Sequence, residues 1–186
     1  MDLSDRIKRA EFLGAEFITW LWYREEAQAG IFDLGGDLGQ VEVTFEDRLT
    51  MSSTALDDQE DSFKGGRPSS SIEAKMALRL GKLARQAKIR VTQGEQEWIF
   101  TLREAPLMMS AIKLPEIMTK GGQTQFFERM FLLEHLDRLY KALYQRYLEE
   151  RLSERWRGDI LPEINRWVAL GEVAEYSEGA EETEAP

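Results

Sequence analysis

A run of four large side chains, Trp20-Leu21-Trp22-Tyr23, constrains the fold more than any other feature of this sequence. The run lies in residues 5–27, where apolar side chains recur at the three- and four-residue spacing of an α-helix. Ser4 is placed to cap the start of this helix, and Gly30 fits its end. Because consecutive positions point to different sides of a helix, four in a row make it apolar on more than one side. The sequence therefore predicts a helix sandwiched between other elements rather than laid on a surface.

Two stretches show the alternation of apolar and polar residues that is typical of β-strands with one exposed face. In residues 41–46 and 49–51 every second side chain is apolar, which predicts a hairpin. A second hairpin is predicted from residues 89–91 and 98–102, which flank a Gln-Gly-Glu turn. Residues 107–115 are largely apolar and follow a proline, so we expect a buried extended segment there.

Three further segments have the spacing of helices. Residues 71–86 follow the potential cap Ser71 and predict an amphipathic helix. Residues 124–152 predict a long helix, and residues 153–170 predict another that Pro162 kinks or splits. We therefore expect an α+β fold, in which antiparallel β hairpins form a small sheet. The sheet is packed with an N-terminal helix, a middle amphipathic helix and a C-terminal helical hairpin.

The composition is that of one globular domain. The chain has 186 residues, of which 42% are hydrophobic, and this is enough to bury a core. We assign residues 1–171 to a single domain with a mobile loop at 52–70, and residues 172–186 to a disordered acidic tail. The chain contains no cysteine, which excludes disulfides and thiolate metal sites. Because no apolar run is long enough to span a bilayer and no secretory signal is present, we expect a cytoplasmic protein without a membrane partner.

Charge is unevenly distributed along the chain. The net charge is −10, yet residues 64–90 hold eight Lys or Arg against one acidic residue, Glu73. On the predicted middle helix, Lys75, Arg79 and Lys82 would project together as one positive ridge that can contact a phosphate backbone. The candidate nucleic-acid contacts are Lys64, Arg67, Lys75, Arg79, Lys82 and Arg85. The other interpretation is a solvated face whose charges are balanced by acidic neighbours or by the acidic tail.

No group of residues predicts catalysis, a cofactor or a metal. His135 is the only histidine, and a single histidine on a charged helix face is typical of a surface residue. The acidic residues at 57–61 lack the spacing of a calcium loop, and the paired glycines lack that of a phosphate-binding loop. We therefore expect no enzymatic activity, no cofactor and no metal site.

The predicted long helix carries a short heptad run that has two interpretations. Its residues are Leu133, Leu136, Tyr140, Leu143 and Tyr147. The run can form the seam of a homodimer, or it can pack on the predicted sheet. Arg129 stands where the heptad would have an apolar residue, which keeps the run short. The aromatic side chains of residues 20–23 also have two interpretations, because they can stack on bases or belong to the core.

Several segments together resemble a known family. They are residues 12–23, residues 97–102, residues 113–115, residues 128–134, and residues 151–153 with Trp156. Their order and spacing over residues 10–168 resemble the C-terminal portion of bacterial proteins of the recombination-associated RdgC family. The resemblance implies an α+β protein linked to DNA recombination and replication, homodimeric and binding DNA without sequence preference. The N-terminal half of the longer relatives has no counterpart here, and the candidate DNA contacts rest on charge alone.

Two hypotheses of function follow from these observations. The first is a non-enzymatic protein of bacterial or phage DNA metabolism that binds nucleic acid non-specifically or regulates a DNA-binding partner. The second is a protein-interaction or oligomerisation module that does not bind nucleic acid. Salt-dependent DNA binding favours the first, and self-association in solution favours the second.

Overall fold

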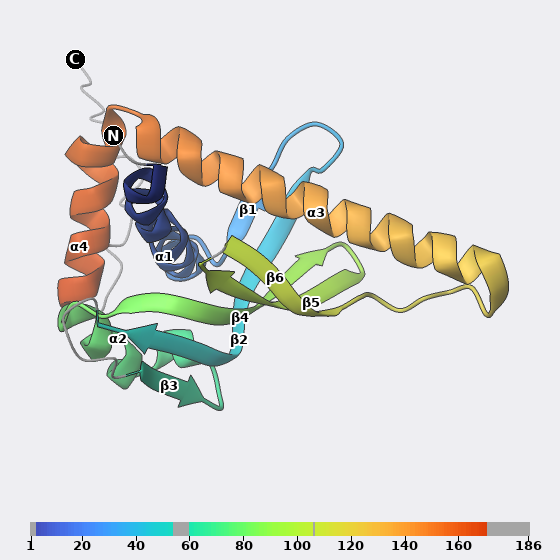
Figure 1. The fold of residues 1–186 in the computed structure, drawn as a ribbon, viewed down its shortest axis with the longest axis horizontal. Coiled ribbons are helices and arrows are strands. Elements are labelled where there is room, and N and C mark those ends of the chain that lie inside the picture. The colour runs from blue at the N-terminus through green and yellow to red at the C-terminus, as the bar shows by residue number, and fades with distance from the viewer. Residues whose placement is uncertain (1–2, 54–59, 106, 171–186) are drawn as a thin grey trace, which may run out of the picture.

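The computed structural model describes residues 3–53, 60–105 and 107–170, and within these ranges it is an α+β fold (Figure 1). The helices are α1 (Leu3–Ala27), α2 (Ile72–Arg79), α3 (Gly122–Leu152) and α4 (Leu161–Leu170), with a 3-10 turn η1 (Pro68–Ser70) and a π-helical turn η2 (Trp156–Ile160). The strands are β1 (Ile31–Asp33), β2 (Gln40–Ser52), β3 (Glu60–Lys64), β4 (Leu83–Gln93), β5 (Gln96–Glu104) and β6 (Leu107–Lys113). The fold class predicted from the sequence is confirmed.

The described strands form a single antiparallel sheet. Its order is β1-β2-β4-β5-β6, and β3 pairs with the second half of β2. Val43 lies opposite Val91 across β2 and β4, and Ile89 lies opposite Phe100 across β4 and β5. All four of these side chains are buried. The alternation of apolar residues along these strands therefore makes one face of the sheet a wall of the core.

Helix α1 is sandwiched, as its sequence predicts. The Phe17 ring lies 5.1 Å from the ring of Tyr144 in α3. On another side of the helix, the Trp22 ring lies 5.3 Å from Trp167 in α4 and 6.3 Å from Phe45 in β2. Because α1 contacts both the sheet and the C-terminal helices, all its side chains from Trp20 to Tyr23 are buried in the core.

The hairpin predicted within residues 41–51 is wrong. Residues Gln40–Ser52 form one continuous strand, β2, whose register against β4 shifts between Phe45 and Leu49. The three residues between them form a bulge, which bends the strand. The chain therefore continues along β4 after the bulge and does not turn back on itself. A bulge and a tight turn leave similar traces in a sequence, since both interrupt the alternation by polar residues.

The middle helix is shorter than predicted, and the side that it buries is not the one that the sequence indicated. Ser71 caps it by accepting the Ala74 N–H at 3.2 Å, but the helix ends at Arg79, and residues from Leu83 onward belong to β4. Pairing of this stretch with β2 and β5 outweighs its local helical preference. The buried residues of α2 are Ala74, Ala77 and Leu78. The exposed apolar residues are Ile72 and Met76 of the helix and its C-cap Leu80, which the apolar spacing had indicated as the packed face.

Two other extended segments also differ from expectation. The loop predicted at 52–70 contains strand β3 and turn η1, and its residues 54–59 lie outside the described residues. The segment expected to be a buried crossing is β6, a strand at the edge of the sheet with half-exposed side chains. The acidic tail predicted at 172–186 lies outside the described residues.

Candidate functional site

The positive ridge predicted for the middle helix is not formed. Lys82 lies in the turn after α2 and Arg85 lies in β4, so neither belongs to the helix. Lys75 Nζ is 2.8 Å from Glu26 Oε2, and Lys82 Nζ is 2.5 Å from Asp61 Oδ2. Arg85 forms an ion pair with a carboxylate of β5. Most of the ridge is thus neutralised by carboxylates, which removes the main reason for predicting phosphate contacts there.

The other three predicted cations are arranged differently. Arg79 Nε donates to the carbonyl oxygen of Val168 at 2.7 Å, which joins the end of α2 to α4. Lys64 and Arg67 are exposed, and neither forms an ion pair with another described residue. The six candidates therefore do not form one surface.

The only histidine is packed between rings. His135 lies 5.5 Å from the Trp98 ring and 6.3 Å from the Phe131 ring, and its Nε2 is 2.6 Å from Gln93 Oε1. Burial lowers the pKa of His135 below its usual range, so the neutral form is favoured. His135 is partly buried, so it belongs to the packing of α3 on the sheet rather than to a fully exposed helix face.

Neither a metal site nor a membrane span is found in the part of the chain that the structure describes. Across residues 3–53, 60–105 and 107–170, no three His, Asp or Glu side chains lie close enough together to hold a metal ion. None of the helices in these ranges is both long and apolar enough to cross a bilayer.

The heptad run of α3 mainly builds the core. Leu136, Leu143 and Tyr147 are buried within the chain, and Tyr140 is partly buried. Tyr147 also donates to Glu16 of α1 at 2.6 Å. Of the predicted interface residues only Leu133 is exposed. The chain itself covers most of these residues, which favours their packing within the fold over a dimer seam.

The first turns of α3 form a projection that we call the arm, defined as residues 114–131. It comprises the segment after β6 and the part of α3 that extends past the end of the sheet (Figure 1). Glu128 joins its two halves by accepting the backbone N–H groups of Met118 at 2.8 Å and Thr119 at 2.9 Å, and also the Thr119 hydroxyl. These hydrogen bonds lower the pKa of Glu128, and the bond from the Thr119 hydroxyl has the largest effect. The arm is therefore held together as a unit.

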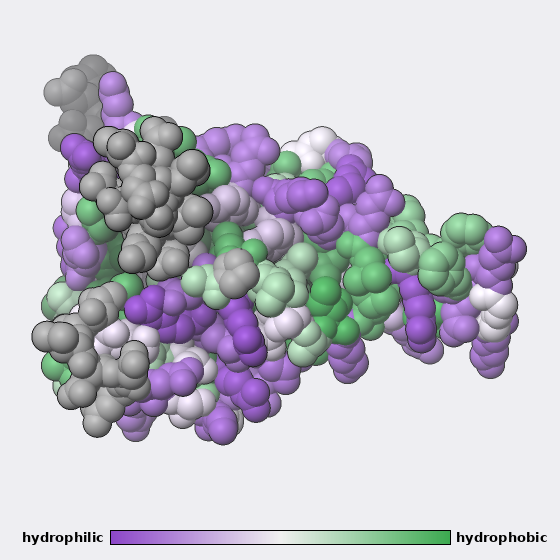
Figure 2. Space-filling view, viewed as in Figure 1, coloured by the Kyte–Doolittle hydropathy of each residue, from purple (hydrophilic) through white to green (hydrophobic). Residues whose placement is uncertain are grey.

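The arm exposes large apolar side chains. They are Met118 (82% exposed), Phe126 (57%), Phe127 (58%), Met130 (49%) and Phe131 (64%). Met108 and Ile112 of β6, the strand that leads into the arm, are also exposed. Figure 2 shows apolar side chains gathered along the arm, whereas hydrophilic ones dominate much of the rest of that face. We call these seven residues the apolar surface.

Apart from Leu133, the exposed apolar residues of α3 lie outside its heptad run. The buried stripe of the helix begins at Leu132 and continues through Leu136 and Leu139. At 100° per residue, Phe127 and Met130 lie on the side of the helix opposite this stripe. Apolar residues on two opposite sides of the same helix were the signal that could have identified a second contact surface.

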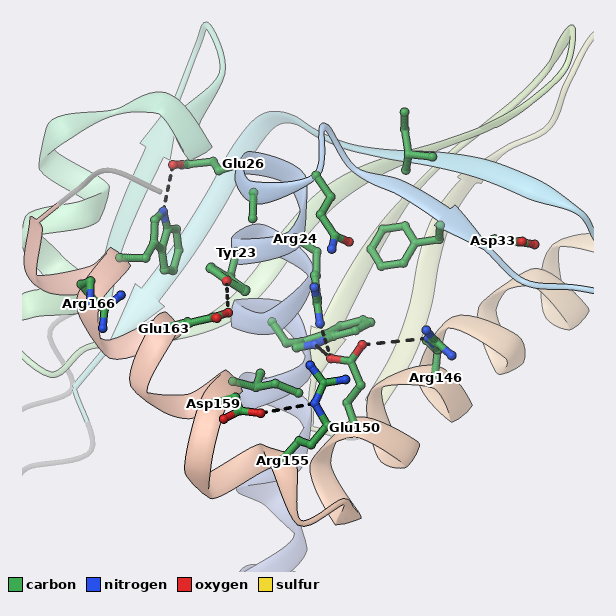
Figure 3. Close-up of a pocket in the computed structure, with 17 residues that line it drawn as sticks. Tyr23, Arg24, Glu26, Asp33, Arg146, Glu150, Arg155, Asp159, Glu163 and Arg166 are labelled. Atoms are coloured by element: carbon green, nitrogen blue, oxygen red, sulfur yellow. Dashed lines mark hydrogen bonds and ion pairs between the residues drawn. The ribbon is translucent and has the colours of Figure 1, made fainter. Parts of the chain in front are cut away.

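A cleft of about 560 Å³ lies where α1, α3, η2 and α4 meet (Figure 3). The side chain of Arg24 lies in its centre and donates to Glu150 Oε2 at 2.5 Å. The same oxygen accepts the Trp20 indole N–H at 2.9 Å, and Glu163 accepts the Tyr23 hydroxyl at 2.9 Å. These carboxylates hold elements of the fold together.

Two further carboxylates of the cleft are also engaged. Asp159 accepts from Arg155 Nε at 3.3 Å, and Glu26 accepts the Trp167 indole N–H at 2.9 Å. A general acid or base must be within reach of a substrate proton, whereas these groups are directed at neighbouring donors. The cleft is best explained as a junction of helices, and the apolar surface is the better candidate functional site.

Comparisons with protein-family models, with curated proteins and with solved structures found no match to this chain. The similarity to the RdgC family therefore stays a prediction from sequence.

Proposed function

We propose that this chain is a protein-interaction module that self-associates through the apolar surface. With about 200 Å² for each large side chain, its seven residues expose about 800 Å² of apolar area. This summed area is comparable with what one partner contributes to a standard interface. The area of the apolar surface is the observation that carries the proposal.

A second copy of the chain is the occupant whose chemistry fits best. The seven residues of the apolar surface are uncharged, and the four charged side chains of the arm, Glu116, Lys120, Glu128 and Arg129, sum to zero. Glu128 is moreover bonded to the arm's own backbone. A surface so poor in charge offers little to a charged partner, whereas an identical apolar surface is self-complementary in a two-fold dimer.

The other exposed apolar group is smaller. It consists of Ile72, Met76 and Leu80 on α2, which by the same measure expose about 400 Å². It lies near the end of α4, and the chain continues there into residues 171–186. We therefore use this group as the control surface rather than as the proposed interface.

Sedimentation velocity over a wide range of protein concentrations tests the proposal. We expect the full chain to form a dimer, and the variant Phe127→Glu/Phe131→Glu to dissociate at least 100-fold more readily. Burying one of these rings contributes about 3 kcal/mol per copy at 25 cal/mol per Å², and buried like charges would add repulsion.

The matched control is Ile72→Glu/Leu80→Glu, which adds the same charge at exposed apolar positions of α2. We expect this variant to dimerise like the original chain. A full chain that stays monomeric at every concentration would contradict the proposal, and so would equal weakening by the two double variants.

Nucleic-acid binding in bacterial or phage DNA metabolism is the alternative proposal. Arg48 and Lys64 face each other across β2 and β3, both are exposed, and neither pairs with a carboxylate of the described chain. Together with Arg67 they form an exposed group of cations that can contact a phosphate backbone. Fluorescence anisotropy with a labelled duplex should then show binding that weakens as salt increases and is lost in Lys64→Glu/Arg67→Glu. No binding at low salt, by the full chain or by residues 1–171, would exclude this alternative.

A further inference from the structure

Strand β6 is an open edge of the sheet. Among the described strands it pairs only with β5, and its seven residues make it much longer than β1, which has three. The second edge of an antiparallel strand presents N–H and C=O groups that can pair with another strand. The sheet therefore has one long edge suited to accepting a strand.

The residues of β6 do little to prevent such pairing. Six of them are uncharged, Leu-Met-Met-Ser-Ala-Ile, and the only charge is Lys113 at the end. By contrast, β3 carries Glu60, Asp61 and Lys64 within five residues. Edge strands of soluble proteins are usually protected by charges, prolines or bulges. Here a residue with a positive φ of 50°, Ala111, lies beside a register shift, which leaves residues 107–110 as the regular part of the edge.

The edge strand leads directly into the arm. Met108 and Ile112 of β6 belong to the apolar surface, and the chain passes directly from Lys113 into the arm. A partner that pairs with β6 would thus lie beside the apolar side chains that need cover.

We propose that two copies of the chain join by antiparallel pairing of their β6 strands, so that their sheets become one continuous sheet. This inference rests on the proposed function, because it specifies how the second copy binds. Antiparallel pairing of a strand with itself creates a two-fold axis across residues 107–110. The two arms then extend in opposite directions, and each runs past the start of the partner subunit's β6, where the partner covers it.

Disulfide trapping tests the pairing, since the chain contains no cysteine of its own. Single cysteines replace Leu107, Met108, Met109 and Ser110 in turn in the full chain. Opposed residues of antiparallel strands have Cα atoms about 5 Å apart, which suits a disulfide. Two residues from the axis, the equivalent Cα atoms are about 13 Å apart, which is too far. We therefore expect one position, or two adjacent ones, to give a crosslinked dimer under mild oxidation.

The control is Ile31→Cys in β1, the short edge strand, because Ile31 and Met108 are equally exposed at 45%. It should not crosslink, and crosslinking within β6 should disappear when Phe127→Glu/Phe131→Glu is added. Hydrogen exchange gives a second readout: the amides of β6 that do not bond to β5 should exchange slowly in the dimer and rapidly in that variant.

The outcomes separate the two proposals. If the chain is a dimer but no β6 cysteine crosslinks and no additional β6 amide is protected, the strand pairing is wrong while self-association stands. If the chain is monomeric, both are wrong. Equal crosslinking at all four positions would also overturn the inference, since a fixed antiparallel register allows a maximum at one place only.

Discussion

Replacing Glu26 by glutamine should destabilise the protein far more than the same change at its neighbour Glu25. The Glu26 carboxylate connects three helices: it accepts the indole N–H of Trp22 at 3.1 Å, that of Trp167 at 2.9 Å, and Lys75 Nζ at 2.8 Å. The side chains of Glu26 and Lys75 are 19% and 18% exposed, so solvent screens the pair only partly. Glu26 therefore ties α1 to both α2 and α4.

The expected loss follows from these contacts. Glutamine can place its amide oxygen at the Oε2 position, but the bonds from Trp167 and Lys75 then end on a neutral acceptor and Lys75 loses its counter-charge. The NH2 group then faces the Trp22 indole N–H. Trp22 is less affected, because its indole N–H also donates to the Ser69 carbonyl at 2.9 Å. Hydrogen bonds to a charged group contribute about 1.5–3 kcal/mol each, so Glu26→Gln should lower the free energy of unfolding by about 3 kcal/mol. For a domain of this size that corresponds to a melting temperature about 6–12 °C lower.

Glu25 supplies the matched control on the same helix turn. Its Oε1 accepts the Phe45 N–H at 3.0 Å, a bond that the amide oxygen of glutamine can also accept. Burial raises the pKa of Glu25 above its usual value, so its ionised form costs stability at neutral pH. That cost is present above the raised pKa and disappears as the pH falls through it. Glu25→Gln should therefore be neutral or stabilising at pH 7, with an advantage that shrinks on acidification.

Urea unfolding followed by circular dichroism measures both changes in one protein. Because the two variants remove the same charge from adjacent residues, their difference reports on local contacts rather than on net charge. Equal losses for Glu26→Gln and Glu25→Gln would refute the reasoning, and so would a loss below about 0.5 kcal/mol at Glu26, which is typical of an exposed ion pair.

Two further predictions concern α3 and α1. The pKa of His135 is lowered by burial, so the unfolded chain takes up that proton first; stability should fall as the pH drops below about 6.5, and His135→Gln should flatten this slope in unfolding curves measured at several pH values. A Cβ at Gly14 would lie 2.2 Å from the Glu104 carbonyl oxygen, so Gly14→Ala should cost about 1–3 kcal/mol. Gly158→Ala, where nothing lies within 4 Å of the added Cβ, should cost less than about 0.5 kcal/mol, and calorimetry would reveal any equal loss that contradicts this.

The sequence alone determined the features that depend on local periodicity. The sandwiched α1 follows from residues 20–23, and the hairpin of β4 and β5 follows from alternation on both sides of Gly94. Each is a pattern within a few turns or strand residues, so it can be recognised without knowing the neighbours. The α+β class follows from these patterns together.

Tertiary structure decided which residues are free to act. Lys75 is bonded to Glu26, 49 residues away, and Lys82 to Asp61 in another element, so a charge pattern that suggested a binding ridge became mainly internal pairing. The rings of the arm are apolar and yet exposed, because α3 extends past the end of the sheet that it covers (Figure 1). Charge pairing and burial depend on contacts between segments distant in sequence, and local spacing carries no information about where those segments meet.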